Sequence, residues 1–500
     1  MPNPPQEREP DPTGAPVGRR TRTRPAIAFG LLAVLVLALA VAGSGVAGGG
    51  AGATVSAAPS AATSSLPIDT ASPRVASAAP TALPPTTPPS ATPGPSAGSS
   101  ASPAPGPARV PDALAAQLDA RLAQLRKSAA IPGVSVAIAW DDGRLWLGAA
   151  GMADIAAKEP VTTGTAFALA SVSKTLTAAV VLQLVGEGRL ALDQPVALLL
   201  PAYELDPRIT VRMLLDHTSG LPDYFLNPKI EKPLRVEPDA AWTPERAWSY
   251  VRPKRPVPGT VWSYSNTNYM LLGELVEAVT GSTIALEVRT RLLDPLALRS
   301  SWYQAVEKPR AGGATGYRRV AKEGGGSRYV RVAPPSDVMP FRSVVTAAGG
   351  AGSIAATAMD AARWIGAFAR GEVLPADVQA AMVADAAVTQ AMAAGVGYGL
   401  GIRVISLDGR RALGHSGRFL GFRNVVAYVP EAGVSIAVLT NQGTYDPAKI
   451  ATRLLKVAAP RPDITPPPDV TPSPSSSAGS GSSAPASASP SASSSPAPPG

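Results

Sequence analysis

The stretch Ala170-Ser171-Val172-Ser173-Lys174-Thr175-Leu176-Thr177 decides how the rest of the chain is interpreted. It lies between a short apolar segment, 167–170, and a longer apolar run, 178–185, that is typical of a buried helix. On a helix, Ser171 and Lys174 lie about one turn apart and share a face. A buried lysine has a lowered pKa, so it can take the serine proton and make that hydroxyl a nucleophile. The alternative is that Ser171 only caps a core helix.

The composition restricts the possible chemistry. The chain has 500 residues with 54 Pro and 47 Gly, too many for one compact fold, so part of the length must be linker. It contains no Cys and only two His, His217 and His415, which argues against a thiolate or His-built metal site. The net charge is +9, but the arginines are scattered and no aromatic-rich basic patch is present. We therefore expect no metal, no cofactor and no nucleic-acid partner.

Both ends of the chain differ in character from its middle. Residues 1–25 are polar and basic, residues 26–43 contain an uninterrupted apolar run, and residues 44–109 consist mainly of Ala, Ser, Pro, Thr and Gly. The apolar run fits either a single membrane anchor or a signal peptide, and the basic residues before it predict a cytoplasmic N-terminus. We expect residues 44–109 and 459–500 to be a disordered linker and tail, with the working part outside the cytoplasm, held at the cell membrane or secreted.

Residues 110–458 have the composition of a globular domain, with strand patterns at both ends. Apolar runs at 134–140 and 145–150 flank Asp142-Gly143, which predicts a hairpin. Further strands are expected at 400–407, 412–416, 424–428 and 434–439. Helical patterns occupy most of the middle, including 267–279 and 356–370. These patterns predict an α/β (α+β) fold, in which an antiparallel sheet of N- and C-terminal strands is flanked by helices and carries a mainly helical insertion.

A second polar motif, Tyr264-Ser265-Asn266, precedes one of these helices. A phenol beside Lys174 could act as a general base, and Asn266 could bind a substrate carbonyl or Lys174 itself. The alternative is that Asn266 or Thr267 merely caps the helix that follows.

A third motif, His415-Ser416-Gly417, closes a predicted strand. A backbone N–H at a strand edge lined by a small residue can complete an oxyanion hole. The alternative is a strand-end turn with a surface histidine.

In this order, the three motifs resemble those of the serine β-lactamase and penicillin-binding-protein superfamily. The resemblance is greatest to the class C β-lactamase-related family, which contains D-alanyl-D-alanine carboxypeptidases, D-aminopeptidases and esterases. It extends over nearly the whole globular part. Other similar stretches are 214–222, 348–350, 397–401 and 439–441.

This resemblance implies a role for each site residue. Ser171 would be the acylated nucleophile, and Lys174 would share or remove its proton. Tyr264 would be the base that later protonates the leaving group, and Asn266 would orient the substrate carbonyl. The N–H groups of Ser171 and Arg418 would form the oxyanion hole.

His415, followed by Ser416 and Gly417, takes the place where β-lactamases usually have a lysine that binds the substrate carboxylate. Because histidine titrates near neutrality, substrates with a free carboxylate should bind better near pH 6 than at pH 8. The change argues against penicillinase activity and favours the esterase and D-aminopeptidase types. A Ser–His triad with Asp216 and His217 is a weaker alternative, because that stretch matches a structural loop of the family.

Two functions from different classes fit these motifs. The first is an extracytoplasmic serine hydrolase that cleaves an amide or ester in a small-molecule or peptide substrate, with peptidoglycan as one source. The second is a receptor, tethered to the membrane through residues 26–43, that binds penicillin or cell-wall fragments with little or no turnover.

Overall fold

The computed structural model describes residues 108–253, 255–334, 336–393 and 397–461. The predicted segments 1–25 and 26–43 lie outside these residues, as do nearly all of the predicted linker 44–109 and tail 459–500. Within the described ranges, no helix combines the length and apolar character needed to cross a membrane.

The main sheet joins the two ends of the globular part, as predicted. In the described part of the chain it has eight strands in the order β1-β3-β2-β13-β12-β11-β10, with β4 beside β3. Apart from the parallel pair β1 and β3, neighbouring strands run antiparallel. The strands are β1 (Ala108–Arg109), β2 (Gly133–Trp140), β3 (Arg144–Asp154), β4 (Glu159–Pro160), β10 (Arg403–Leu407), β11 (Arg410–Phe419), β12 (Phe422–Val429) and β13 (Val434–Thr440). Because Ala108–Arg109 already form β1, the fold begins slightly before the predicted boundary at 110.

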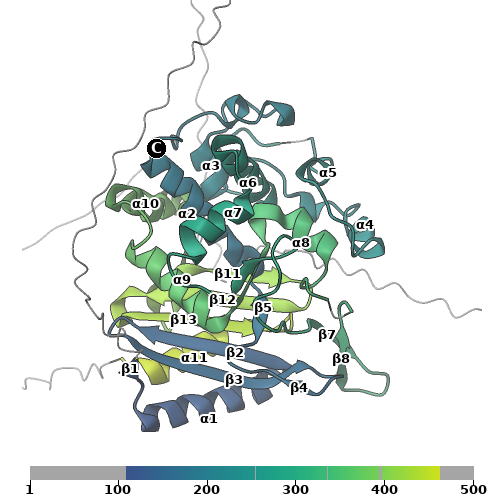
Figure 1. Cartoon of the computed structure of the whole chain (residues 1–500), viewed down its shortest axis with the longest axis vertical. Coiled ribbons are helices and arrows are strands. Elements are labelled where there is room, and N and C mark those ends of the chain that lie inside the picture. The colour runs from purple at the N-terminus through teal and green to yellow at the C-terminus, as the bar shows by residue number, and fades with distance from the viewer. Residues whose placement is uncertain (1–107, 254, 335, 394–396, 462–500) are drawn as a thin grey trace, which may run out of the picture. The chain divides into compact units, whose positions relative to one another are not determined.

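Both faces of this sheet are buried under helices (Figure 1). On one face, α1 (Asp112–Ala129) and α11 (Ala448–Ala458) pack against β3 and β13, and alternate residues such as Val136 and Ile436 join their apolar cluster. On the other face, α9 (Ala358–Arg370) packs on β2, β12 and β13, where Ala137 lies in the second cluster. Successive side chains of a strand point to opposite faces of the sheet, so each strand contributes residues to both apolar clusters.

The region between the terminal strands is mainly helical, also as predicted. Its helices are α2 (Ser173–Gly186), α3 (Val211–Asp216), α4 (Glu231–Val236), α5 (Pro244–Trp248), α6 (Asn266–Thr280), α7 (Ile284–Val288), α8 (Arg342–Ala348) and α10 (Ala376–Met392). A small sheet of β5 (Ala166–Ala168), β9 (Ile354–Thr357) and β6 (Ser301–Tyr303) and a hairpin of β7 (Tyr317–Ala321) and β8 (Ser327–Arg331) complete it. The predicted helix at 356–370 starts later, because Ala356 and Thr357 belong to β9 and the Thr357 hydroxyl caps α9.

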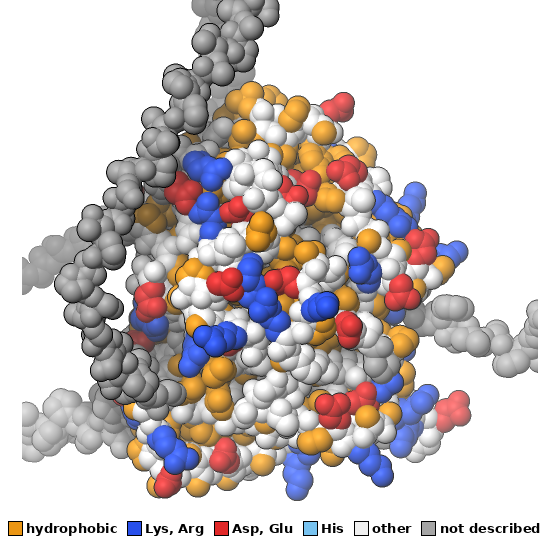
Figure 2. Space-filling model, in the orientation of Figure 1, with side chains coloured by type: hydrophobic (Ala, Val, Ile, Leu, Met, Phe, Trp, Pro, Cys, Tyr) orange, Lys and Arg blue, Asp and Glu red, His pale blue; other side chains and the backbone are white. Residues whose placement is uncertain are grey.

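Charged side chains are mixed on the face shown in Figure 2. Lys and Arg are interspersed with Asp and Glu there, rather than gathered into one basic patch. The net charge of +9 is therefore not concentrated in one basic patch on that face.

Candidate active site

The turn that carries Ser171 lies between β5 and α2, in the 3₁₀ turn η1 (Ala170–Val172). Ala170 has a φ of 51°, in the left-handed region, and such a conformation costs on the order of 1–3 kcal/mol. Two hydrogen bonds to Ile354 hold the turn: its carbonyl accepts from Leu169 N–H at 2.9 Å, and its N–H donates to Ser173 Oγ at 3.0 Å. Ser171, the candidate nucleophile in this turn, is 9% exposed.

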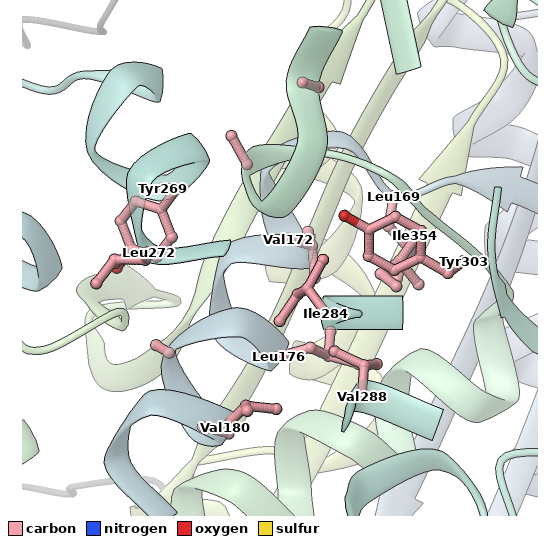
Figure 3. Close-up of a cluster of buried hydrophobic side chains, with 14 of the residues drawn as sticks. Leu169, Val172, Leu176, Val180, Tyr269, Leu272, Ile284, Val288, Tyr303 and Ile354 are labelled. Atoms are coloured by element: carbon pink, nitrogen blue, oxygen red, sulfur yellow. The ribbon is translucent and has the colours of Figure 1, made fainter. Parts of the chain in front are cut away.

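Apolar packing holds the start of α2 in place. Figure 3 shows Leu169, Val172, Leu176 and Val180 in one buried cluster that also contains Ile284 of α7. Burying one such side chain contributes about 1.5–3 kcal/mol. Since four of them lie close to Ser171 in the chain, their burial outweighs the strain of the turn.

Lys174 is fully buried and points at the nucleophile. Its Nζ donates to Ser171 Oγ at 3.2 Å, to Asn266 Oδ1 at 2.7 Å and to the Ala351 carbonyl at 2.9 Å. Burial lowers the pKa of Lys174 to about 7, the charge of Asp223 opposes this shift, and the charge of Arg403 adds to it. At neutral pH a substantial fraction of Lys174 is thus a free amine within reach of the serine proton.

The structure contradicts the alternatives in which Ser171 caps α2 and in which Asn266 or Thr267 caps α6. No side-chain hydrogen bond caps α2 or α6. Ser171 instead meets Lys174, and Asn266, the first residue of α6, accepts from Lys174 and donates to Asp223. Both motifs are therefore arranged around the buried lysine.

Tyr264 lies over this lysine, with the centre of its ring 5.1 Å from Lys174 Nζ. Its phenol oxygen makes no hydrogen bond within the described residues, although the Ser171 hydroxyl is close enough to lower its pKa. Burial has the larger effect and raises the pKa of Tyr264, while the Arg403 guanidinium, 5.3 Å from the ring centre, opposes that shift. Protonated phenol is therefore the favoured form, which suits a proton donor better than the initial base that the resemblance implied.

Asp223 is a functional residue that the sequence motifs did not reveal. Its carboxylate accepts from Asn266 Nδ2 at 2.7 Å and from Phe225 N–H at 2.9 Å. It is 5% exposed, and burial raises its pKa while the two N–H donors and Lys174 oppose this shift. The carboxylate fixes the orientation of the Asn266 amide, so that Oδ1 faces Lys174. The sequence does show an acidic residue directly after Leu221-Pro222. However, Asp223 and Asn266 are 43 residues apart, so no local pattern predicts their hydrogen bond.

His415 lies on β11 close to Tyr264, with ring centres 6.3 Å apart, but it is only 1% exposed. Its Nδ1 is 2.7 Å from the Ser416 carbonyl, which can only accept, so Nδ1 carries the proton and Nε2 accepts from Tyr398 Oη at 3.0 Å. Burial, with Arg403 and Lys174 adding to it, holds the pKa of His415 well below its ordinary value. The expected gain in carboxylate binding near pH 6 therefore has no basis in this geometry.

Gly417 brings the same strand against the nucleophile turn. A Cβ at this position would lie 2.0 Å from the Leu169 carbonyl oxygen and 3.4 Å from the Ala170 Cβ. Only glycine allows β11 to pass this close. The next residue on β11 is Arg418, whose N–H the family resemblance assigns, together with that of Ser171, to the oxyanion hole.

His217 and Asp216 do not form a triad with Ser171. His217 Nδ1 is 3.2 Å from the N–H of Ser265, which donates to it, and the His217 ring packs 4.3 Å from the ring of Tyr264. Asp216 Oδ1 accepts from the backbone and hydroxyl of Thr218 instead. Among the described residues no group of His, Cys, Asp and Glu side chains is arranged to hold a metal ion.

Comparison with known proteins shows the family of this chain. The family model described as Beta-lactamase matches residues 118–459. Penicillin-binding protein 4 of Amycolatopsis lactamdurans is 32% identical over 341 residues, covering 65% of this chain and 84% of that protein. Esterase EstB of Burkholderia gladioli is 31% identical over 377 residues, covering 68% and 94%.

A solved structure shares the same fold. The D-stereospecific amidohydrolase from Streptomyces sp. superposes with a TM-score of 0.56 at 27% identity, covering 68% of this chain and 97% of that one. Since the family match spans more than half of the chain and includes every residue of the site built above, this protein belongs to the β-lactamase family of serine hydrolases.

Proposed function

We propose that this protein hydrolyses an amide or ester bond through an acyl-enzyme at Ser171, outside the cytoplasm. The observation that carries this proposal is the contact between Lys174 Nζ and Ser171 Oγ, 3.2 Å, made by a fully buried amine. Burial lowers the pKa of this lysine to about 7, so the group that removes the serine proton is available at neutral pH.

The first half-reaction uses the site as follows. The free amine of Lys174 takes the proton of Ser171, whose oxygen bonds to the substrate carbonyl carbon. The developing oxyanion is stabilised by the N–H groups of Ser171 and Arg418. As the bond to the leaving group breaks, the phenol of Tyr264 donates the proton that the departing nitrogen or oxygen needs.

The second half-reaction regenerates the enzyme. Water adds to the acyl carbon and gives up a proton to the Tyr264 oxygen, and the bond to Ser171 Oγ breaks as Lys174 returns its proton. The side-chain amide of Asn266, which donates to Asp223, accepts from Lys174 and stays beside the substrate carbonyl in both half-reactions.

The leaving group lies at the end of the site that contains Tyr264, His415 and Arg403. Arg403 Cζ is 5.3 Å from the ring centre of Tyr264 and 5.5 Å from that of Tyr398. Because His415 is neutral, Arg403 is the permanent cation at this end, and a leaving group with a free carboxylate can pair with it. This supports a D-amino-acid peptide, from peptidoglycan or another source, as the substrate beside simple esters and amides.

An extracytoplasmic location rests on residues 1–43. The basic segment 1–25 followed by the apolar run within 26–43 supports either a single-pass anchor in the cell membrane or a cleaved signal peptide. Membrane fractionation of cells producing the full chain, with protease added outside, separates an anchored or secreted protein from an internal one.

A covalent probe tests the activity. The full-length protein should react with a fluorophosphonate and should turn over short esters and D-amino acid amides. Ser171→Ala should lose both reactions, whereas Ser173→Ala, two residues away, should keep labelling because Ser173 Oγ only accepts from Ile354 N–H. A penicillin adduct that forms and persists without turnover of any substrate would support a receptor instead. No labelling at all would contradict both functions.

A further inference from the structure

A pocket of about 270 Å³ is lined by residues that directly follow Gly417, the residue of β11 that packs against the nucleophile turn. Arg418, whose N–H we assign to the oxyanion hole in the proposed function, lines it, and so does Phe419. A Cβ on Gly352 would lie 2.6 Å from Phe419 Cζ, so this ring covers the residue next to Ala351, which binds Lys174. The pocket therefore shares a wall with the segment that binds Lys174. It is smaller than the roughly 300–1,000 Å³ of a complete ligand site, so it suits one substituent of a substrate.

The position of this pocket determines which substituent enters it. Tyr264, the proton donor, lies near His415, so the leaving group occupies that end of β11. Along the strand, His415 is followed by Gly417 at the nucleophile turn and then by Arg418 and the pocket. This order predicts that the acyl group, on the opposite side of the scissile bond, extends past Arg418 towards the pocket.

Part of the pocket lining is apolar. Phe225 and Val344 are each 4% exposed, and Phe419, Leu420 and Val332 are partly buried. Such a lining favours an acyl chain without polar atoms next to its carbonyl.

The rest of the lining is rich in arginine. Five of the lining residues are arginines, and no Asp or Glu belongs to the described lining: Arg235, Arg318, Arg319, Arg331 and Arg418. Two of them are neutralised, since Arg235 pairs with Glu231 at 2.9 Å and Arg331 pairs with Asp154.

The other three arginines make no ion pair with any residue that the structure describes. Arg319 donates to the Ser327 hydroxyl at 2.6 Å, which leaves Arg318 and Arg418 to bind a ligand. Burial and the charge of Arg423 lower the pKa of Arg418, which means that its positive charge lacks a compensating anion. A bound anion would supply that compensation.

We propose that the pocket selects substrates whose acyl group has an apolar stem and a terminal carboxylate, which Arg418 and Arg318 bind. This inference rests on the proposed function, because it requires acyl transfer to Ser171. It adds a preference on the acyl side of the bond, whereas Arg403 acts on the leaving-group side.

The test compares matched esters. The 4-nitrophenyl monoesters of adipic and suberic acid carry a free carboxylate at the end of an apolar acyl chain, and the methyl-capped diesters are neutral. With the full-length protein, kcat/KM for a monoester should exceed that of its capped diester by on the order of 10-fold, as for a charge-assisted hydrogen bond. The ratio should fall as ionic strength rises.

Variants assign the effect to the pocket. Arg418→Gln and Arg318→Gln should each lower this ratio several-fold, and Arg418→Lys should restore part of it. Arg411→Gln is the matched control, because Arg411 is an exposed arginine on the same strand that does not line the pocket.

The outcomes separate this inference from the proposed function. If both esters are hydrolysed by a Ser171-dependent route but the carboxylate is not preferred, the inference is wrong and the function stands. The same holds if the preference survives in Arg318→Gln/Arg418→Gln. If neither ester nor the fluorophosphonate reacts, the proposed function fails and the inference fails with it.

Discussion

Replacing Asp223 by Asn tests how the buried charges set the working pH of the enzyme. In the wild type, kcat/KM should fall as the pH drops below about 7, because protonated Lys174 cannot take the serine proton. The negative charge of Asp223 raises the pKa of Lys174 against the effect of burial. Removing that charge should therefore lower the pKa of Lys174 and move the acidic limb of the profile to lower pH.

The distances in the site limit the size of this effect. Lys174 Nζ is 2.7 Å from Asn266 Oδ1, and Asn266 Nδ2 is 2.7 Å from Asp223 Oδ2. With the width of one amide between them, the two charges lie about 8 Å apart, and at an effective dielectric constant of about 20 they interact by about 2 kcal/mol. This corresponds to about 1.5 pKa units, an upper limit because burial raises the pKa of Asp223 and reduces its charged fraction.

The measurement is kcat/KM for a short 4-nitrophenyl ester from about pH 5 to about pH 9 at constant ionic strength. The maximum rate of Asp223→Asn should also fall, because one of the N–H donors from Asn266 and Phe225 loses its acceptor. Asp239→Asn, which removes an exposed carboxylate, should leave the profile unchanged. An acidic limb that stays in place or moves to higher pH in Asp223→Asn would refute the proposed coupling.

Four further changes have definite expected results. Lys174→Ala should lower kcat by at least about 10²-fold, and an unchanged rate in the ester assay would make the Ser-Lys spacing coincidental. Gly417→Ala should lower the free energy of unfolding by about 1–3 kcal/mol, measured by denaturant titration, because its Cβ would lie 2.0 Å from the Leu169 carbonyl; full stability would contradict the close approach. His415→Lys should lower Tm and give no gain on carboxylate-bearing leaving groups, since it buries an ammonium beside two other cations; a clear gain would restore the carboxylate role first expected there. A protein lacking residues 1–107 should keep its kcat/KM, because the described fold begins at Ala108; loss of activity would place part of the site in the removed segment.

The predictions that succeeded depend on short-range patterns. The hairpin around Asp142-Gly143 and the late strands are encoded by alternation and turn residues, which act over a few positions. The error at Ala356 and Thr357 has a tertiary cause. These residues have a helical pattern locally, but they pair with β5 and β6 to close the small sheet.

The sequence by itself determined the one-turn spacing of Ser171 and Lys174, because a helix places residues three apart on one face whatever surrounds them. Only the tertiary structure decided the protonation of the site. Asp223 reaches Lys174 through Asn266, and Arg403 lies over Tyr264, although these residues are far apart in the chain. Their pKa values depend on burial and on neighbouring charges, which are properties of the packed molecule and not of any local stretch.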